Sequence, residues 1–266
     1  MNKKRRIKKF VIVTLILVAV FCLMGGQALA EPNVSITRDG INIGSSQDPK
    51  EVSSSIQLLL MLTILAVAPS ILIMMTGFTR IIIILSFLRN ALGTQQMPPN
   101  QILIGLALFI TFFVMTPVIT DINNNAYQPY SKGEINSQVA IERSSQTIKT
   151  WMVKQIFSNK REKDLELFMT ISGQKDPIRV QDAPKLSLTI VAPAFIISEM
   201  TVAFKFGFLI FLPFLIIDMI VSSTLMSMGM MMLPPVMISL PFKILLFILV
   251  DGWSMLTQSI VVSFAR

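Results

Sequence analysis

The chain has 266 residues, of which 53% are hydrophobic and only 14% are charged. Soluble domains carry about 25% charged residues, so the composition excludes an ordinary soluble domain and indicates an integral membrane protein. The formal net charge of +8 does not indicate nucleic-acid binding, because much of the basic excess lies in the first ten residues.

Residues 1–30 predict a cleaved secretory signal peptide. Six basic residues among the first ten are followed by an apolar run from Phe10 to Met24 and by small residues at Ala28 and Ala30. This order is typical of a signal peptide, and the alternative is an uncleaved anchor helix. Removing those six of the 23 basic residues leaves 17 against 15 acidic ones, and the same cut removes Cys22, the only cysteine.

The mature chain therefore contains neither cysteine nor histidine, two residue types common among nucleophiles, general bases and metal ligands. We expect no catalytic residues, no cofactor and no metal. A copper site built from methionine thioethers is an alternative, but without histidine or mature cysteine the ligand chemistry disfavours it.

Residues 31–54 are polar and rich in turn-forming residues, and they predict an exposed amino terminus. Residues 55–120 predict a first apolar helical hairpin. Its first apolar run, 56–88, is interrupted only by Arg80 and exceeds the length of about 20 residues that crosses a bilayer. We therefore expect this run to be kinked at Pro69 or to continue past the membrane.

A loop follows at Gly93, Pro98 and Pro99, because glycine and proline end helices. The second apolar run, 102–119, carries no charge. Residues 121–185 are charged and amphipathic, and they predict a small helical insert. Since the signal peptide places the mature amino terminus outside, we expect this insert to be extracytoplasmic and Arg80 to lie near the cytoplasmic end, as the positive-inside bias expects.

Residues 186–266 predict a second apolar helical hairpin, so the fold class is an all-α integral membrane protein. Five charges interrupt this apolar stretch: Glu199, Lys205, Asp218, Lys243 and Asp251. Each costs about 2.5–3.5 kcal/mol at the bilayer centre. They could pair between subunits, line a proton path, or lie in segments that are not in lipid. Glu199 and Lys205 are about 240° apart around one helix, and we interpret the five as charges that pair between subunits.

The turn of the second hairpin concentrates methionine at Met226, Met228, Met230, Met231 and Met232. Methionine is flexible and fills irregular gaps, so packing in a core is one interpretation. Gly229 and the pair Pro234–Pro235 predict a non-helical turn, which at membrane depth is tolerated only inside protein or beside a cavity. This favours a deformable collar around a passage, although the residues alone leave both interpretations open.

Four stretches resemble the flagellar biosynthetic protein FliP family. They are "LRNALGTQQMPPNQILIGLALFITFFVMTPVI" (88–119), "PAFIISEMTVAFKFG" (193–207), "GMMMLPP" (229–235) and "PFKILLFILVDGW" (241–253). The resemblance covers roughly residues 55–264. One departure is Phe206, where the family usually has isoleucine or methionine.

The resemblance implies a core subunit of the flagellar type III export gate, located in the bacterial cytoplasmic membrane within the basal body. It implies a ring-like helical homo-oligomer that forms, with FliQ and FliR, the channel for unfolded flagellar proteins and works with other export-apparatus membrane proteins. The methionine-rich loop would be the gasket of that channel. In such assemblies the apolar hairpins are largely buried against other subunits, and the complex sits partly above the membrane plane.

Two alternatives remain at this point. The first is an export-gate subunit of the injectisome, which serves virulence secretion. The second is a monomeric membrane transporter, but carriers commonly show two repeated halves, and the two hairpins here differ in charge and proline placement.

Overall fold

The computed structural model describes residues 33–37, 40–44, 49–94, 96–173, 179–230 and 233–264. The predicted signal peptide, residues 1–30, lies outside them. The described residues fall into two compact units, with the boundary between Pro69 and Ser70.

The first unit contains a two-stranded antiparallel ribbon that the sequence analysis did not predict. Strands β1 (Asn33–Thr37) and β2 (Gly40–Gly44) pair so that Val34 lies opposite Ile43 and Ile36 opposite Ile41. Helix α2 (Pro49–Met74) then begins inside the region predicted as an exposed terminus and crosses into the second unit.

The apolar run 56–88 is broken after Met74 rather than forming one helix. Residues 75–77 separate α2 from α3 (Phe78–Leu92), whereas Pro69, the expected site of a kink, lies inside α2. Gly77 lies against the ring of Phe264, with no room for a Cβ atom. The break therefore lets the start of α3 approach the carboxyl-terminal helix closely.

Helices α3 and α4 (Asn100–Ile122) form the first predicted hairpin, and they pack against each other. Gly93 ends α3 in the left-handed conformation, with φ of 76°, as glycine does readily at helix ends. Helix α4 continues without interruption through a π-helical turn η1 (Asn123–Tyr127) and α5 (Gln128–Ser131), beyond the predicted end of the apolar run.

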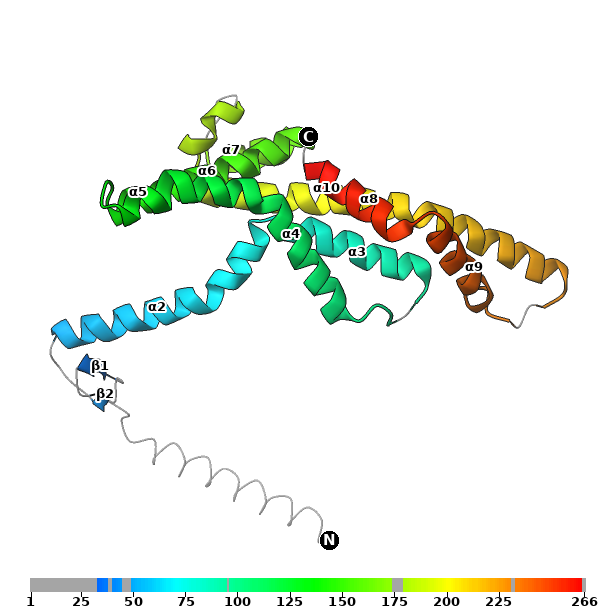
Figure 1. The fold of residues 1–266 in the computed structure, drawn as a ribbon, viewed down its shortest axis with the longest axis horizontal. Coiled ribbons are helices and arrows are strands. Elements are labelled where there is room, and N and C mark those ends of the chain that lie inside the picture. The colour runs from blue at the N-terminus through cyan, green and yellow to red at the C-terminus, as the bar shows by residue number, and fades with distance from the viewer. Residues whose placement is uncertain are drawn as a thin grey trace, which may run out of the picture. The chain divides into compact units, whose positions relative to one another are not determined.

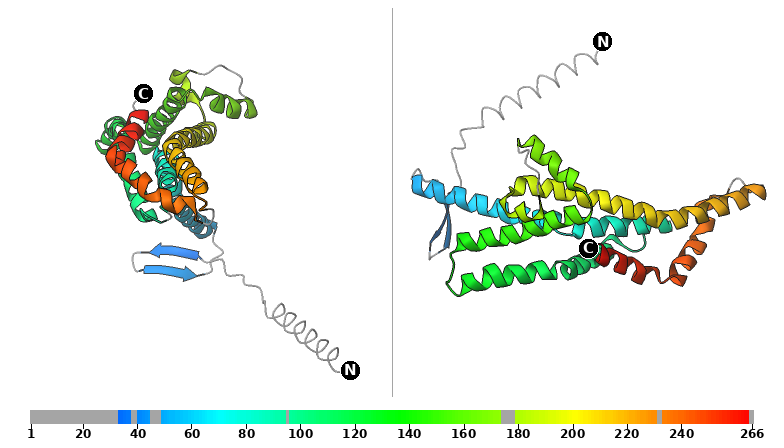
Figure 2. Two further views of the ribbon diagram at one scale, coloured as in Figure 1. Left: turned by 90° about the vertical axis from the view of Figure 1, so that its right-hand side faces the viewer. Right: turned by 90° about the horizontal axis from the view of Figure 1, so that it is seen from above.

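The insert is helical, as predicted, and it packs on the rest of the second unit. It contains α6 (Ser137–Ser158), α7 (Glu162–Ile171) and the 3₁₀ turn η2 (Val180–Lys185). Asn136 caps α6 by accepting a hydrogen bond from the Val139 N–H. Figure 2 shows α6 running alongside α4 and α8.

The second hairpin is formed by α8 (Leu188–Ser227), α9 (Pro235–Leu249) and α10 (Gly252–Phe264). Helix α8 runs beside α3 and continues past it to the turn that leads into α9 (Figure 1). Its 40 residues span about 60 Å at 1.5 Å per residue, twice the hydrocarbon thickness of about 30 Å.

Two buried clusters hold the second unit together. One joins α3, α4, α8, α9 and α10 around Ile84, Leu85 and Ile260, and the other joins α6, α7, η2 and α8 around Met152, Ile156 and Phe195. Among the described residues two helices, 100–131 and 188–227, are long and apolar enough to span a membrane. The α9–α10 pair, bent by 64°, would be a third if it is one broken span. The all-α membrane fold is thus confirmed for residues 49–264, with the β-ribbon added before it.

Candidate functional site

The most deeply buried charges of the second unit are Arg80 on α3 and Glu199 on α8. Both side chains have 0% of their surface exposed. The Arg80 guanidinium donates from Nε to Glu199 Oε2 at 2.7 Å and from Nη2 to Glu199 Oε1. This bidentate arrangement, with two parallel N–H···O bonds, is among the strongest interactions of an arginine with a carboxylate.

Three further side chains complete the surroundings of this pair. Asn159, after α6, donates to Glu199 Oε1 at 3.3 Å. Arg80 Nη1 donates to Ser263 Oγ on α10 at 3.1 Å, and the Arg80 guanidinium lies 4.0 Å from the centre of the Phe264 ring. A buried charge is costly unless it is paired and hydrogen-bonded. The pair therefore joins α3, α8 and α10 to the end of α6.

A second ion pair joins α8 to α9. Lys243 Nζ donates to Asp218 Oδ2 at 2.7 Å, and Ser239 Oγ donates to Asp218 Oδ1 at 2.5 Å. Lys243 is 3% exposed and Asp218 is 28% exposed. This pair is therefore closer to the surface than the Arg80–Glu199 pair, and solvent or a neighbouring protein can reach one side of it.

These contacts correct the expectation that the five charges pair between subunits. Glu199, Asp218 and Lys243 find their partners inside the same chain. Lys205 and Asp251 are exposed and make no ion pair with any residue that the structure describes. For these two, pairing between subunits remains a prediction.

Arg80 was not recognised as a site residue from the sequence. Its signal was that it is the only charge in the apolar run 56–88. We expected Arg80 to be a basic residue near the cytoplasmic end of a span, but its complete burial shows that its partner is protein. The partner lies 119 positions away in the chain, which no spacing within one helix can indicate.

Backbone hydrogen bonds within the methionine turn cap the carboxyl-terminal end of α8. The N–H of Met230 donates to Leu225 O at 3.0 Å, and the N–H of Gly229 donates to Met226 O at 3.1 Å. Gly229 has φ of 74°. This is the Schellman motif, in which a left-handed glycine satisfies the last carbonyl groups of a helix.

The three methionine side chains that the structure describes at this turn lie outside the core. Met226, Met228 and Met230 are 58%, 62% and 42% exposed. This excludes gap-filling within the single chain for these three. Met231 and Met232, the other two predicted gasket residues, lie outside the described residues.

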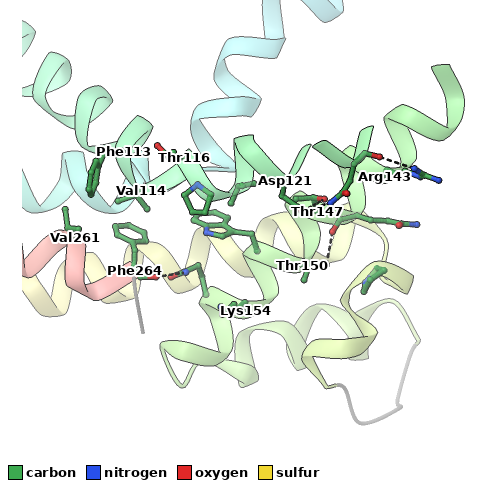
Figure 3. A pocket seen from close by; sticks show the side chains of 17 residues that line it. Phe113, Val114, Thr116, Asp121, Arg143, Thr147, Thr150, Lys154, Val261 and Phe264 are labelled. Carbon is green, nitrogen blue, oxygen red and sulfur yellow. Dashed lines mark hydrogen bonds between the residues drawn. The ribbon is translucent and has the colours of Figure 1, made fainter. Parts of the chain in front are cut away.

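A groove lies between α4, α6 and α10 (Figure 3). Its volume is about 860 Å³, with Phe113 and Phe264 at an apolar end and Asp121 and Arg143 at a polar end. Gln155 donates from Nε2 to Phe264 O at 3.1 Å, and its buried Oε1 has no partner. Among the described residues no three His, Cys, Asp or Glu side chains lie together as metal ligands.

Comparison with known proteins matches residues 61–260 to the FliP family. The flagellar biosynthetic protein FliP of Bacillus subtilis is 56% identical over 224 residues, which cover 84% of this chain and 98% of that protein. The chain belongs to the FliP family. The FliP proteins of Pectobacterium carotovorum (50% identical, 79% of each chain) and Treponema denticola (43% identical, 90% of this chain and 88% of that protein) are similar over comparable lengths.

The two longest FliP-like stretches of the second hairpin each contribute to an ion pair. Glu199 lies in 193–207 and Lys243 in 241–253, whereas their partners Arg80 and Asp218 lie outside these stretches. Phe206, the departure from the usual FliP residue, is partly buried against the first cluster. The larger side chain is thus accommodated in the packing of α8.

Proposed function

We propose that this protein is a core subunit of the flagellar type III protein export gate in the bacterial cytoplasmic membrane. Several copies, together with FliQ and FliR, would form a channel within the basal body for unfolded flagellar proteins in transit. The observation that carries this proposal is membership of the FliP family over residues 61–260, with relatives named as flagellar biosynthetic proteins. Those names favour the flagellar assignment over the injectisome.

The exposed apolar surface supports the homo-oligomeric part of the proposal. In the most apolar 18-residue window of α8 only 6% of the residues are buried within the chain. Helix α8 is also about twice as long as the hydrocarbon layer, so lipid cannot cover all of it. Neighbouring protein subunits are the remaining cover, and other export-apparatus membrane proteins would be among them.

The methionine turn supports the gasket part of the proposal. Three of its methionines are exposed, while the backbone of the turn is held by its own hydrogen bonds. Flexible thioether side chains adapt to different shapes. A ring of such turns would close around a resting channel and deform around a passing chain without any catalytic residue.

The oligomeric state is the first test. The mass of the detergent-extracted particle should correspond to several copies with FliQ and FliR bound, and deleting the gene should abolish flagella and motility. A monomer without these partners would contradict the proposal and favour a single-chain transporter.

The gasket is tested by replacing Met230, Met231 and Met232 with alanine. We expect ions or small solutes to leak through the gate while the particle keeps its mass. Met61→Ala and Met255→Ala serve as controls, because these methionines are exposed but lie on α2 and α10. Leakage and export that both stay at the unsubstituted level would show that the turn is not a gasket.

A further inference from the structure

Two of the five charges in α8, α9 and α10 are left over once the ion pairs are assigned. Lys205 lies on α8 and Asp251 at the break between α9 and α10. Each is exposed, and neither has an ionic partner among the described residues. The remainder is one cation and one anion, so the two leftover charges are complementary.

The surroundings of Lys205 lack an anion. A groove of about 600 Å³ beside it is lined by Ile197, Met200, Thr201, Phe204 and Phe208. A second groove, of about 680 Å³, lies on its other side, and it too has no Asp or Glu in its lining. Lys205 thus lies between an apolar groove and a groove with polar residues in its lining, such as Asn159 and Gln258, and neither groove supplies an anion.

Asp251 has the opposite character in a similar setting. Its neighbours Ile248, Leu249 and Val250 are 68%, 74% and 45% exposed. Its φ of 48° is left-handed, a conformation that Asp and Asn adopt more readily than most residues. The backbone therefore accounts for a short polar residue at this break, but not for a negative charge.

Pairing of the two within one chain is disfavoured by the geometry of α10. Ser259 lines a groove together with Lys205, and it lies eight positions after Asp251. Eight residues of helix extend about 12 Å, Asp251 does not line this groove, and no ion pair joins it to Lys205 within the chain.

We propose that Lys205 of one copy pairs with Asp251 of a neighbouring copy. The inference rests on the homo-oligomer of the proposed function, and it identifies the residues of the contact. In a head-to-tail assembly each copy offers Lys205 to one neighbour and Asp251 to the other. Apolar side chains beside both residues shield the pair from water. Every contact between adjacent copies in a ring-like assembly then joins one Lys205 to one Asp251.

The test uses a carbodiimide, which joins a lysine amine to a carboxylate in direct contact. Two differently tagged chains, K205Q and D251N, are co-expressed, so that the only possible Lys205–Asp251 pair joins two chains. We expect a cross-linked species that carries both tags, with the joined peptides identified by mass spectrometry. Asparagine at position 251 preserves the tolerance for a left-handed backbone.

A second measurement follows dissociation of the oligomer on dilution in detergent. K205Q and D251N should each weaken the assembly several-fold, and the double variant should be no weaker than either single one, because both remove the same contact. K163Q is the matched control, since Lys163 is an exposed lysine on α7 and should leave assembly unchanged.

Three results would overturn the inference. An intact oligomer without the two-tag cross-link removes the pairing and leaves the proposed function in place, whereas a monomeric unsubstituted protein removes both. If K205Q loses a co-purifying anionic phospholipid while D251N assembles normally, the partner of Lys205 is a lipid headgroup.

Discussion

The two halves of α8 differ in how completely their own chain covers them. In residues 188–207 one face is buried around Ile190, Phe195 and Glu199 by α3, α6 and α7. In residues 208–227, all of which the structure describes, only Phe214 is buried. Both halves are almost wholly apolar, so hydropathy alone does not distinguish them.

This difference indicates two kinds of apolar surface in one helix. The first half belongs to a protein core that contains the Arg80–Glu199 ion pair. Charged side chains are costly in lipid, so this pair belongs in protein. The second half leaves most of its apolar side chains uncovered by its own chain, so other chains or lipid must cover them. Substitutions in the first half should therefore destabilise the single chain, and substitutions in the second should act mainly on assembly.

The largest expected effect is that of Arg80→Met. It leaves Glu199 buried without its partner, and breaking such a pair costs about 3–5 kcal/mol. We expect little folded protein, measured by thermal unfolding and protease resistance in detergent. The double variant Arg80→Met, Glu199→Leu should recover much of the loss, because apolar replacement of a whole buried pair is often neutral. A double variant as unstable as the single one would show that charge is required there.

Gly207→Ala should have the next largest effect. A Cβ atom at this position would lie 2.4 Å from a ring carbon of Phe87, so α3 and α8 would have to separate. Overpacking of this kind costs about 1–3 kcal/mol. Gly105→Ala on α4 is the control, since nothing lies within 4 Å there, and alanine should stabilise that helix by about 0.5–1 kcal/mol. Equal unfolding temperatures for the two variants would contradict close α3–α8 packing.

Asp218→Asn should have the smallest effect on the chain itself. The pair with Lys243 is partly exposed, and asparagine keeps an oxygen that can accept from the lysine. We expect a loss of about 1 kcal/mol in unfolding free energy, with any larger defect in the yield of assembled particle. Destabilisation as severe as that of Arg80→Met would mean that both halves of α8 are core.

Much of the architecture could be predicted from the sequence because it depends on local patterns. The uncharged run 102–119 indicated α4, and Gly93 with the prolines at 98 and 99 indicated the loop before it. The ribbon at 33–44 was missed because its polar composition suggested a terminus, although the alternation of Val34, Ile36, Ile41 and Ile43 is a strand signal.

The charge pairs could not be predicted because they depend on which helices touch. The comparison of Glu199 with Lys205 considered a single helix, whereas the true partner arrives from α3. The break at Asp251 in the second hairpin was also missed, because the stretch after the methionine turn was treated as one apolar segment. The dipeptide Asp251–Gly252 is a turn signal that could have indicated this break. The exposure of Met226, Met228 and Met230 also could not be predicted, because it depends on how the helices pack.

At the end of α8 the backbone conformation does not depend on the methionine side chains. Since main-chain hydrogen bonds and one glycine already fix the bend, no side chain there is needed to keep it folded. The exposed side chains of this turn can therefore be substituted during evolution, which changes the flexibility and polarity of the surface there. Such substitutions leave the fold of α8 intact.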